Sequence, residues 1–410
     1  MAPFPLHLTE LLGKYGAYLV FLLIGFGFGF VLESSGFGNS KKLAAQFYFK
    51  DMTVLKVMFG AIVTAMVLIF ASSALGLLDY NLIWVNPTYL WPGIIGGLIM
   101  GVGFILGGFC PGTSLVAAAT WKIDGVFFVL GVLFGIFVFG ESVRNIDLFW
   151  NSSYMGRFTI MDWLGLSTGW VVLLIVLMAL FMFWGSEQLE KIFGGKDPSK
   201  APKFRYIGAA GLALGALLLI PLGQPTNVDK WDQIAPERET QLANREVQIS
   251  PAELLNTIHD HKLNLIMLDV RDEANYNLFH IADAKHVPVD ELAGIIPELH
   301  LEPKNTVFVV MGNGETAATD AWKYLVAESL PNVYILEGGI NNWLTVFAEG
   351  DNRIRSAETD QGDDSLRFEF AAALGAAFPA SDPHIGEYDL EFIPKIKLEL
   401  KRGPTSGGCG

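Results

Sequence analysis

The sequence predicts a polytopic α-helical membrane domain with an internal repeat, followed by a small soluble α/β domain and a flexible C-terminal tail. Hydrophobic residues make up 51% of the 410 residues, and the mean hydropathy of +0.39 is high for a soluble protein. The apolar residues are concentrated before about residue 222, whereas most of the acidic residues behind the net charge of -14 follow residue 223. We therefore expect the two halves of the chain to face different solvents.

Six apolar segments approach the roughly 20 residues that a helix needs to cross a bilayer. They run over residues 15–32, 54–78, 90–106, 125–139, 170–184 and 207–222. Lysine and arginine mark cytoplasmic loops, and here they gather after the first, third and fifth segments. We expect a multi-pass protein of the bacterial inner membrane, with the first span retained as an anchor and the C-terminal domain and tail on the periplasmic side.

The membrane domain contains a repeat. Residues 27–32 (Gly-Phe-Gly-Phe-Val-Leu) match residues 101–106 (Gly-Val-Gly-Phe-Ile-Leu), and the same register places Gly38 over Gly112. Glycine-interrupted hydrophobic segments at corresponding positions of two repeats point to a transport site between them.

The motif Gly-Gly-Phe-Cys-Pro-Gly-Thr is the expected substrate site, and five of its residues are the candidates: Gly108, Cys110, Pro111, Gly112 and Thr113. The glycines let backbone amides approach a solute, and the proline and threonine separate two helices. A helix N-terminus attracts anions, and the cysteine adds a soft thiol that can contact sulfur. The alternative is a small buried residue at an ordinary helix break, because glycine and proline are common in membrane helices.

Together with residues 25–33 and 51–59, this motif resembles the YeeE/YedE family of sulfur-transport membrane proteins over roughly residues 15–140. The resemblance implies transport of thiosulfate or a related sulfur species, with intramembrane cysteines as relay points. This chain keeps one such cysteine, Cys110, and has Phe37 and Gly38 at the equivalent point of the first repeat. We count Gly38 among the substrate-binding residues and expect a second protomer or a partner to complete a longer relay.

Residues 246–350 predict a small parallel sheet flanked by helices, because β-rich runs alternate with helical patterns. Residues 223–245 are expected to be a linker, and residues 351–402 an acidic extension. The strings Leu-Asp-Val-Arg-Asp-Glu at 268–273 and Leu-Glu-Gly-Gly-Ile at 336–340 resemble the rhodanese family. That resemblance implies transfer of sulfane sulfur through a cysteine persulfide held by the amides of a loop after a central strand.

Six residues form the corresponding loop: Met311, Gly312, Asn313, Gly314, Glu315 and Thr316. Met311 stands at the nucleophile position and Thr316 where an arginine usually follows. A thioether neither ionises nor carries a persulfide, so we expect no sulfurtransferase activity from this domain alone. The loop amides would still suit an anionic sulfur group. The alternative is a degenerate domain kept for docking or dimerisation.

The last eight residues, 403–410, end in Gly-Gly-Cys-Gly. This ending resembles that of the sulfur-carrier subunit of the periplasmic sulfur-oxidising (Sox) system. The resemblance implies that Cys409 is a sulfur-carrying arm, which exchanges sulfur with the rhodanese-like loop or with a periplasmic carrier or sulfurtransferase.

These features favour transport of thiosulfate or sulfane sulfur, with membrane lipid and a second protomer as further expected partners. Two alternatives without solute transport stay open, a membrane-anchored thiol or sulfur relay and a docking module for a sulfur-carrying enzyme. The sequence shows no metal-ligand spacing, no cofactor motif and no basic stripe for nucleic acid.

Overall fold

The computed structural model describes residues 3–6, 8–195, 203–357, 362, 364–388 and 391–399. The chain divides into two compact units, one that ends at Gln224 and one that begins at Pro225. Each unit has its own core, and each is described below by itself.

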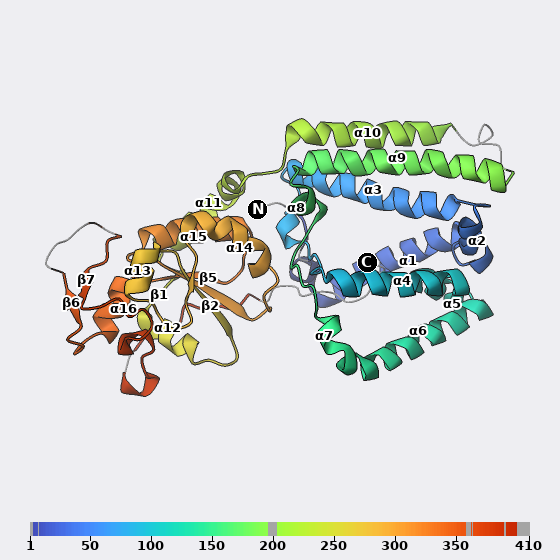
Figure 1. Cartoon of the computed structure of the whole chain (residues 1–410). Helices are drawn as coiled ribbons and strands as arrows, with labels where there is room; N and C mark the ends of the chain where they lie inside the picture. Colours follow the sequence, from blue (N-terminus) through green and yellow to red (C-terminus); the bar gives the residue numbers. More distant parts are fainter. Residues whose placement is uncertain are drawn as a thin grey trace. The chain divides into compact units, whose positions relative to one another are not determined.

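The first unit consists of long apolar helices joined by short ones (Figure 1). In chain order they are α1 (Leu8–Ser34), α2 (Ser40–Ala44), η1 (Ala45–Tyr48), α3 (Thr53–Ala74), η2 (Tyr80–Leu82), α4 (Leu90–Gly107), α5 (Pro111–Ala119), α6 (Ile123–Ser142), η3 (Val143–Ile146), α7 (Asp147–Trp150), α8 (Ile160–Leu164), α9 (Thr168–Phe193) and α10 (Phe204–Leu222). Within the described residues, six helical segments are long and apolar enough to cross a membrane, which confirms the six expected spans.

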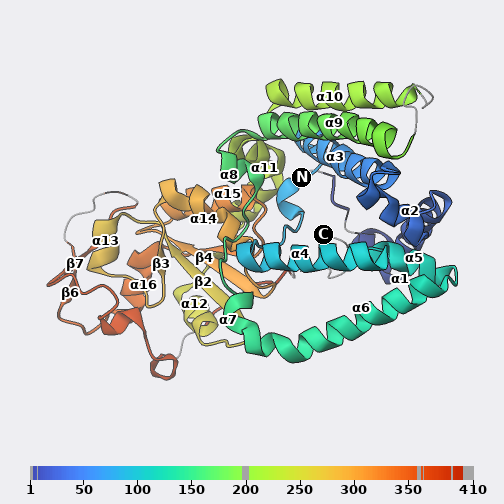
Figure 2. The ribbon, with the colours of Figure 1, turned by 45° about the vertical axis from the view of Figure 1, so that its right-hand side comes forward.

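Helices α3, α9 and α10 form one packed group, and α9 and α10 lie side by side in both Figure 1 and Figure 2. Buried valines such as Val63, Val172 and Val176 meet Ala216 of α10. At Gly169 a Cβ atom would lie 2.8 Å from the carbonyl oxygen of Leu219, so the two backbones approach closely. Small residues allow this close contact between membrane helices.

A second group brings together the segments that the sequence repeat predicted to be related. Phe37, Leu43, Val54, Phe109 and Ala117 form one buried cluster contributed by α2, α3, α5 and the two segments that follow α1 and α4. The helix-ending segments of both repeats therefore share one small core.

The second unit contains a parallel five-stranded sheet in the order β1-β5-β4-β2-β3, which confirms the predicted α/β fold. Its strands are β1 (Gln248–Ile249), β2 (Asn264–Asp269), β3 (Lys285–His286), β4 (Thr306–Met311) and β5 (Val333–Leu336). Its helices are α11 (Asn227–Ala243), α12 (Pro251–Ile258), α13 (Glu273–Leu278), η5 (Val289–Glu291), α14 (Leu292–Leu299), α15 (Thr316–Ala327) and α16 (Gly339–Phe347). Alternate strand residues pack into two clusters, one with α12 and α16 and one with α14 and α15. Both faces of the sheet are thus covered, as parallel sheets require.

Within the expected linker, residues 227–243 form helix α11, which packs on α15. Thr226 and Asp229 form a capping box at its start, and the Trp231 ring packs against the buried Trp322 at 6.1 Å between centroids. Lys230 forms an ion pair of 2.6 Å with Glu328. The sequence did not predict this helix, because α11 is largely polar and only a narrow apolar stripe of it faces the domain.

The acidic extension is ordered along much of its length. Strands β6 (Ile354–Ser356) and β7 (Phe368–Phe370) pair antiparallel, and two short turns follow, η6 (Pro379–Ser381) and η7 (Ile385–Glu387). Side chains of the domain then hold the backbone of residues 395–399: Glu253 Oε1 accepts from the amides of Lys395 and Ile396, and Asn332 Oδ1 accepts from the amide of Glu399.

Candidate functional site

Cys110 caps the N-terminus of α5. The Thr113 amide donates to the Cys110 Sγ atom at 3.4 Å, and the Cys110 amide donates to the Thr113 Oγ1 atom at 3.1 Å. Pro111 follows as the first helical residue, where its missing N–H costs nothing. The thiol is partly exposed, whereas Thr113 is buried. A sulfur atom therefore sits at the positive end of a helix, where negative charge is stabilised.

Gly108 ends α4 with φ of 70°, in the left-handed region that favours glycine. A Cβ atom at this position would lie 3.1 Å from the carbonyl oxygen of Ser40 at the start of α2. The break before α5 and the break before α2 are therefore in direct contact, as expected if both repeats build one site.

The structure pairs the two breaks in a register different from the one the sequence suggested. Gly36 has φ of 77° and precedes the buried Phe37, just as Gly108 has φ of 70° and precedes the buried Phe109. In this register Gly38 corresponds to Cys110, whereas the register taken from the sequence placed Gly38 over Gly112. The register changes because α1 ends in a turn in which the Phe37 amide donates to the carbonyl of Leu32, while α4 ends with the Gly108 amide donating to Phe104.

An ion pair occupies the space where a side chain at Gly38 would lie. Lys122 Nζ is 2.8 Å from Glu33 Oε1, which links the end of α1 to the residue before α6. A Cβ atom at Gly38 would lie 2.8 Å from Lys122 Nζ and collide with Glu33 Oε2. Ser40 Oγ also donates to Asp124 at 2.7 Å. Charged groups thus surround the break of the first repeat, whereas the break of the second repeat carries a thiol.

In the second unit, the loop after β4 carries the predicted rhodanese-like residues. Met311 is the last residue of β4 and is fully buried in the core cluster, so its thioether lies away from the loop surface. Gly312, Asn313 and Gly314 are also buried, and Thr316 begins α15 at the surface. The position expected for a nucleophile is therefore a packing position.

The loop amides already hold an anion. Asp364, from the segment between β6 and β7, accepts from the Gly314 amide at 2.7 Å and from the Ala317 amide at 3.0 Å. Asn313 Nδ2 donates to the Asp364 carbonyl at 3.1 Å. The loop amides that we expected to suit a sulfur group donate in this structure to the chain's own carboxylate.

Glu315 faces a different partner. Its Oε1 atom accepts from Arg245 Nη2 and from the Gly338 amide, both at 2.7 Å. Burial alone would raise the pKa of this carboxyl, but the bonds from Arg245 and Gly338 outweigh it and lower the pKa. Arg245 follows α11, so a cation reaches the loop from the segment expected to be a linker.

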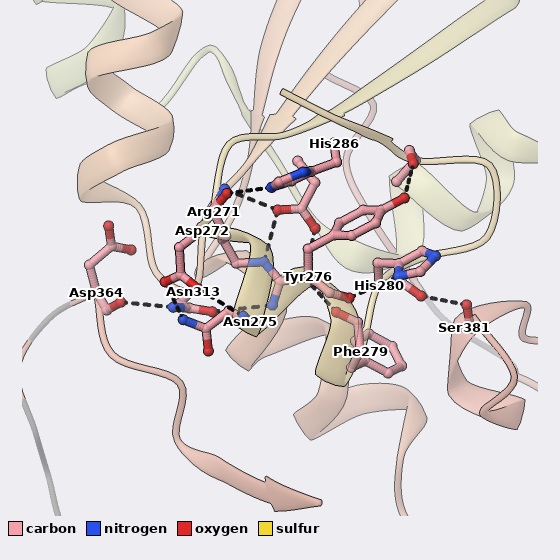
Figure 3. Close-up of polar contacts among 12 residues, drawn as sticks. Arg271, Asp272, Asn275, Tyr276, Phe279, His280, His286, Asn313, Asp364 and Ser381 are labelled. Atoms are coloured by element: carbon pink, nitrogen blue, oxygen red, sulfur yellow. Dashed lines mark hydrogen bonds and ion pairs between the residues drawn. The ribbon is translucent and has the colours of Figure 1, made fainter. Parts of the chain in front are cut away.

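A buried ion pair contacts the loop after β4 through the side chain of Asn313 (Figure 3). Arg271 forms an ion pair with Asp269 at 2.6 Å, and both side chains are almost completely buried. Arg271 also donates to Asn313 Oδ1 at 3.2 Å and to the Phe279 carbonyl at 2.6 Å. Tyr276 stacks on His280 with 3.9 Å between ring centroids. These side chains contact one another and the backbone around the loop.

Asp364 and Arg245 could not be predicted as loop contacts from the sequence, because both reach the loop from distant segments. Cys409 and its neighbours lie outside the described residues. Among the described residues no group of three His, Cys, Asp or Glu side chains is placed to hold a metal ion.

Comparisons with known proteins divide the chain in the same way. Residues 34–229 match the family model described as sulphur transport, and residues 250–345 match the rhodanese-like domain. The thiosulfate transporter TsuA of Spirochaeta thermophila is 28% identical over 221 residues, which cover 48% of this chain and 60% of that protein.

Relatives of the second unit are small sulfurtransferases. The thiosulfate sulfurtransferase GlpE of Pseudomonas fluorescens strain Pf0-1 is 32% identical over 82 residues, covering 20% of this chain and 72% of that protein. GlpE of Pseudomonas paraeruginosa is 25% identical over 119 residues, covering 29% of this chain and 89% of that protein. The chain therefore joins a membrane domain of the sulphur transport (YeeE/YedE) family to a rhodanese-like domain.

Proposed function

We propose that the membrane unit transports a sulfur-containing anion, with thiosulfate as the leading substrate, and that Cys110 is its contact point. The similarity to a protein named as a thiosulfate transporter supports the substrate class. The observation that carries the proposal is the partly exposed Cys110 thiol at the N-terminus of α5, beside the break of the first repeat.

This geometry suits thiosulfate because the ion has two different ends. Its oxygens match the positive end of α5, and its outer sulfur matches the soft Cys110 Sγ atom. The proposed contact is non-covalent, so the anion leaves unchanged and no second thiol is needed at this point.

The second unit has a different proposed role. Cys409 would act as a sulfur-carrying arm: it accepts sulfane sulfur from a partner protein's persulfide, which leaves as a thiol, and brings this sulfur to the membrane unit. The last described residue before it, Glu399, is held by Asn332, and the ten residues from there to Cys409 reach at most about 33–36 Å when extended. Because Met311 is buried and Asp364 fills the loop, these observations favour docking over catalysis as the role of the rhodanese-like domain.

The test is uptake of radiolabelled thiosulfate into proteoliposomes containing the full chain. We expect Cys110→Ala to lose at least tenfold in initial rate, and Cys110→Ser, which keeps a small polar group, to lose less. Cys409→Ala should transport free thiosulfate normally but lose any stimulation by a sulfur-loaded donor protein.

Wild-type rates in Cys110→Ala would exclude an intramembrane thiol contact. A wild-type protein that reconstitutes in folded form and still shows no uptake would favour a relay or docking protein instead.

A further inference from the structure

We propose that Asp364 is an internal plug, whose carboxylate occupies the amide cradle after β4 and keeps small oxyanions out of the rhodanese-like domain. Its two carboxylate oxygens accept separately from the Gly314 and Ala317 amides, at 2.7 and 3.0 Å. Successive backbone N–H groups that donate to separate oxygens of one group can also bind a free oxyanion. The proposal concerns the second unit and is independent of transport by the first.

The cradle keeps its shape through contacts that do not involve Asp364. The Gly312 and Asn313 carbonyls accept from the Ile340 and Asn341 amides at 2.9 and 3.0 Å. Gly339 allows this close approach, because a Cβ atom there would collide with the Gly314 carbonyl oxygen. The carbonyls of the loop are thus engaged by α16, while the Gly314 and Ala317 amides donate to Asp364.

Buried groups reinforce the same loop. Asn313 is 7% exposed, and its Oδ1 atom accepts from Arg271, which is itself fixed by Asp269. Removal of the Asp364 side chain would therefore leave an ordered loop with two unpartnered amides, and such amides gain by binding an anion.

The described residues around Asp364 form no hydrogen bonds with the strands of the five-stranded sheet. This segment connects β6 to β7, which pair only with each other, and Asn341 holds it through the Ser365 carbonyl and the Arg367 amide. Withdrawal of Asp364 therefore breaks no bond of the five-stranded sheet. The plug can open while the domain stays folded.

An external anion has to compete with a tethered carboxylate. A short tether gives an effective concentration on the order of millimolar, so the wild type would bind free oxyanions weakly. The matching ligands are small tetrahedral anions such as thiosulfate and sulfate, since the cradle offers N–H donors and no thiol.

Equilibrium dialysis of the full chain in detergent, with labelled thiosulfate and in parallel with labelled sulfate, tests the plug. We expect Asp364→Ala to bind one more equivalent per chain than the wild type, with affinity at this site raised at least tenfold. Asp364→Asn should give a smaller gain, because its amide oxygen can still accept from one of the two N–H groups while its nitrogen faces the other. The matched control is Asp382→Ala, an exposed aspartate of the same extension, and it should behave as wild type.

Two results would overturn the proposal. One is an Asp364→Ala protein that melts as the wild type does but binds no additional anion. The other is a wild type that already binds the additional equivalent as tightly as the variant. If Asp364→Ala does not fold, Asp364→Asn decides, since it keeps the shape of the side chain. Extra thiosulfate without extra sulfate would identify the outer sulfur as the recognised group.

Discussion

At the scale of single residues, the membrane site depends on backbone geometry as much as on the thiol. Cys110 is placed by the end of α4, and that end needs Gly108 in a left-handed conformation against Ser40. The adjacent Phe109 is buried in the cluster shared by both repeats. A change at Gly108 should therefore move the cysteine without touching it.

We expect Gly108→Ala to destabilise the membrane unit by about 1–2 kcal/mol, the usual cost of a left-handed non-glycine residue. The new Cβ would also crowd the Ser40 carbonyl. Gly103→Ala is the matched control in the same helix, because a Cβ there meets nothing within 4 Å. Thermal unfolding followed by tryptophan fluorescence should show a lower melting temperature for Gly108→Ala alone. Equal melting temperatures for the two variants would contradict this account.

The sequence predicted local features of the site well and distant ones poorly. The helix break at Cys110 follows from its glycines and proline, which act on their own neighbours. Asp364 could not be predicted, because its role depends on a hairpin returning to a loop some 50 positions earlier. The pairing of Gly38 with Cys110 was missed by two positions, because two helix ends of different geometry cannot be aligned from identities alone.

At the scale of elements, the fold of the second unit followed from the alternation of strands and helices. The exceptions are α11 and the ordered extension, which have polar sequences and are stabilised by side-chain contacts with the domain. Tyr334 illustrates this: its hydroxyl accepts from the Lys397 amide at 2.8 Å and donates to the Lys397 carbonyl at 3.1 Å.

The Tyr334 contact predicts a pH dependence. Burial raises the pKa of this phenol above its usual value of about 10, and the nearby Glu399 and Glu253 add to the rise. The folded state therefore holds the proton more tightly than the unfolded state does. Its contribution to stability is complete below about pH 10 and is lost as pH rises through the folded-state pKa.

Urea unfolding of the full chain between pH 8 and 11 should show this loss. Tyr334→Phe should start less stable, since it lacks the two bonds to Lys397, and should decline less steeply above pH 10. Some slope should persist because burial also raises the pKa of Tyr276 and Tyr324. Parallel curves for the two proteins would mean that Tyr334 does not titrate in this range.

Across the whole molecule, the lysines and arginines of the membrane unit are concentrated in or beside the loops on one side, after the first, third and fifth spans. Lys41, Lys42, Lys122 and Lys191 lie in or beside the loops after the first, third and fifth spans, Lys203 precedes the sixth span and Arg205 lies in its first turn. The intervening loops contain chiefly Arg144 and Arg157. This asymmetry predicts a periplasmic C-terminal unit.

The two cysteines allow a direct test of orientation. In a Cys110→Ala background, a membrane-impermeant maleimide should label Cys409 in intact spheroplasts as fully as after detergent lysis. A Cys409→Ala variant gives the background signal. Labelling that requires inverted vesicles or detergent would place the C-terminal unit in the cytoplasm and reverse the orientation.

The pairing of Gly38 with Cys110 has a kinetic consequence. One half of the duplicated unit offers a sulfur atom, and the other offers glycine covered by the Glu33–Lys122 pair. A path with a single thiol holds one substrate at that point, so a following ion cannot displace the first from a neighbouring thiol. Under the proposed function, flux would rise hyperbolically with substrate concentration and saturate when release from Cys110 becomes the slow step.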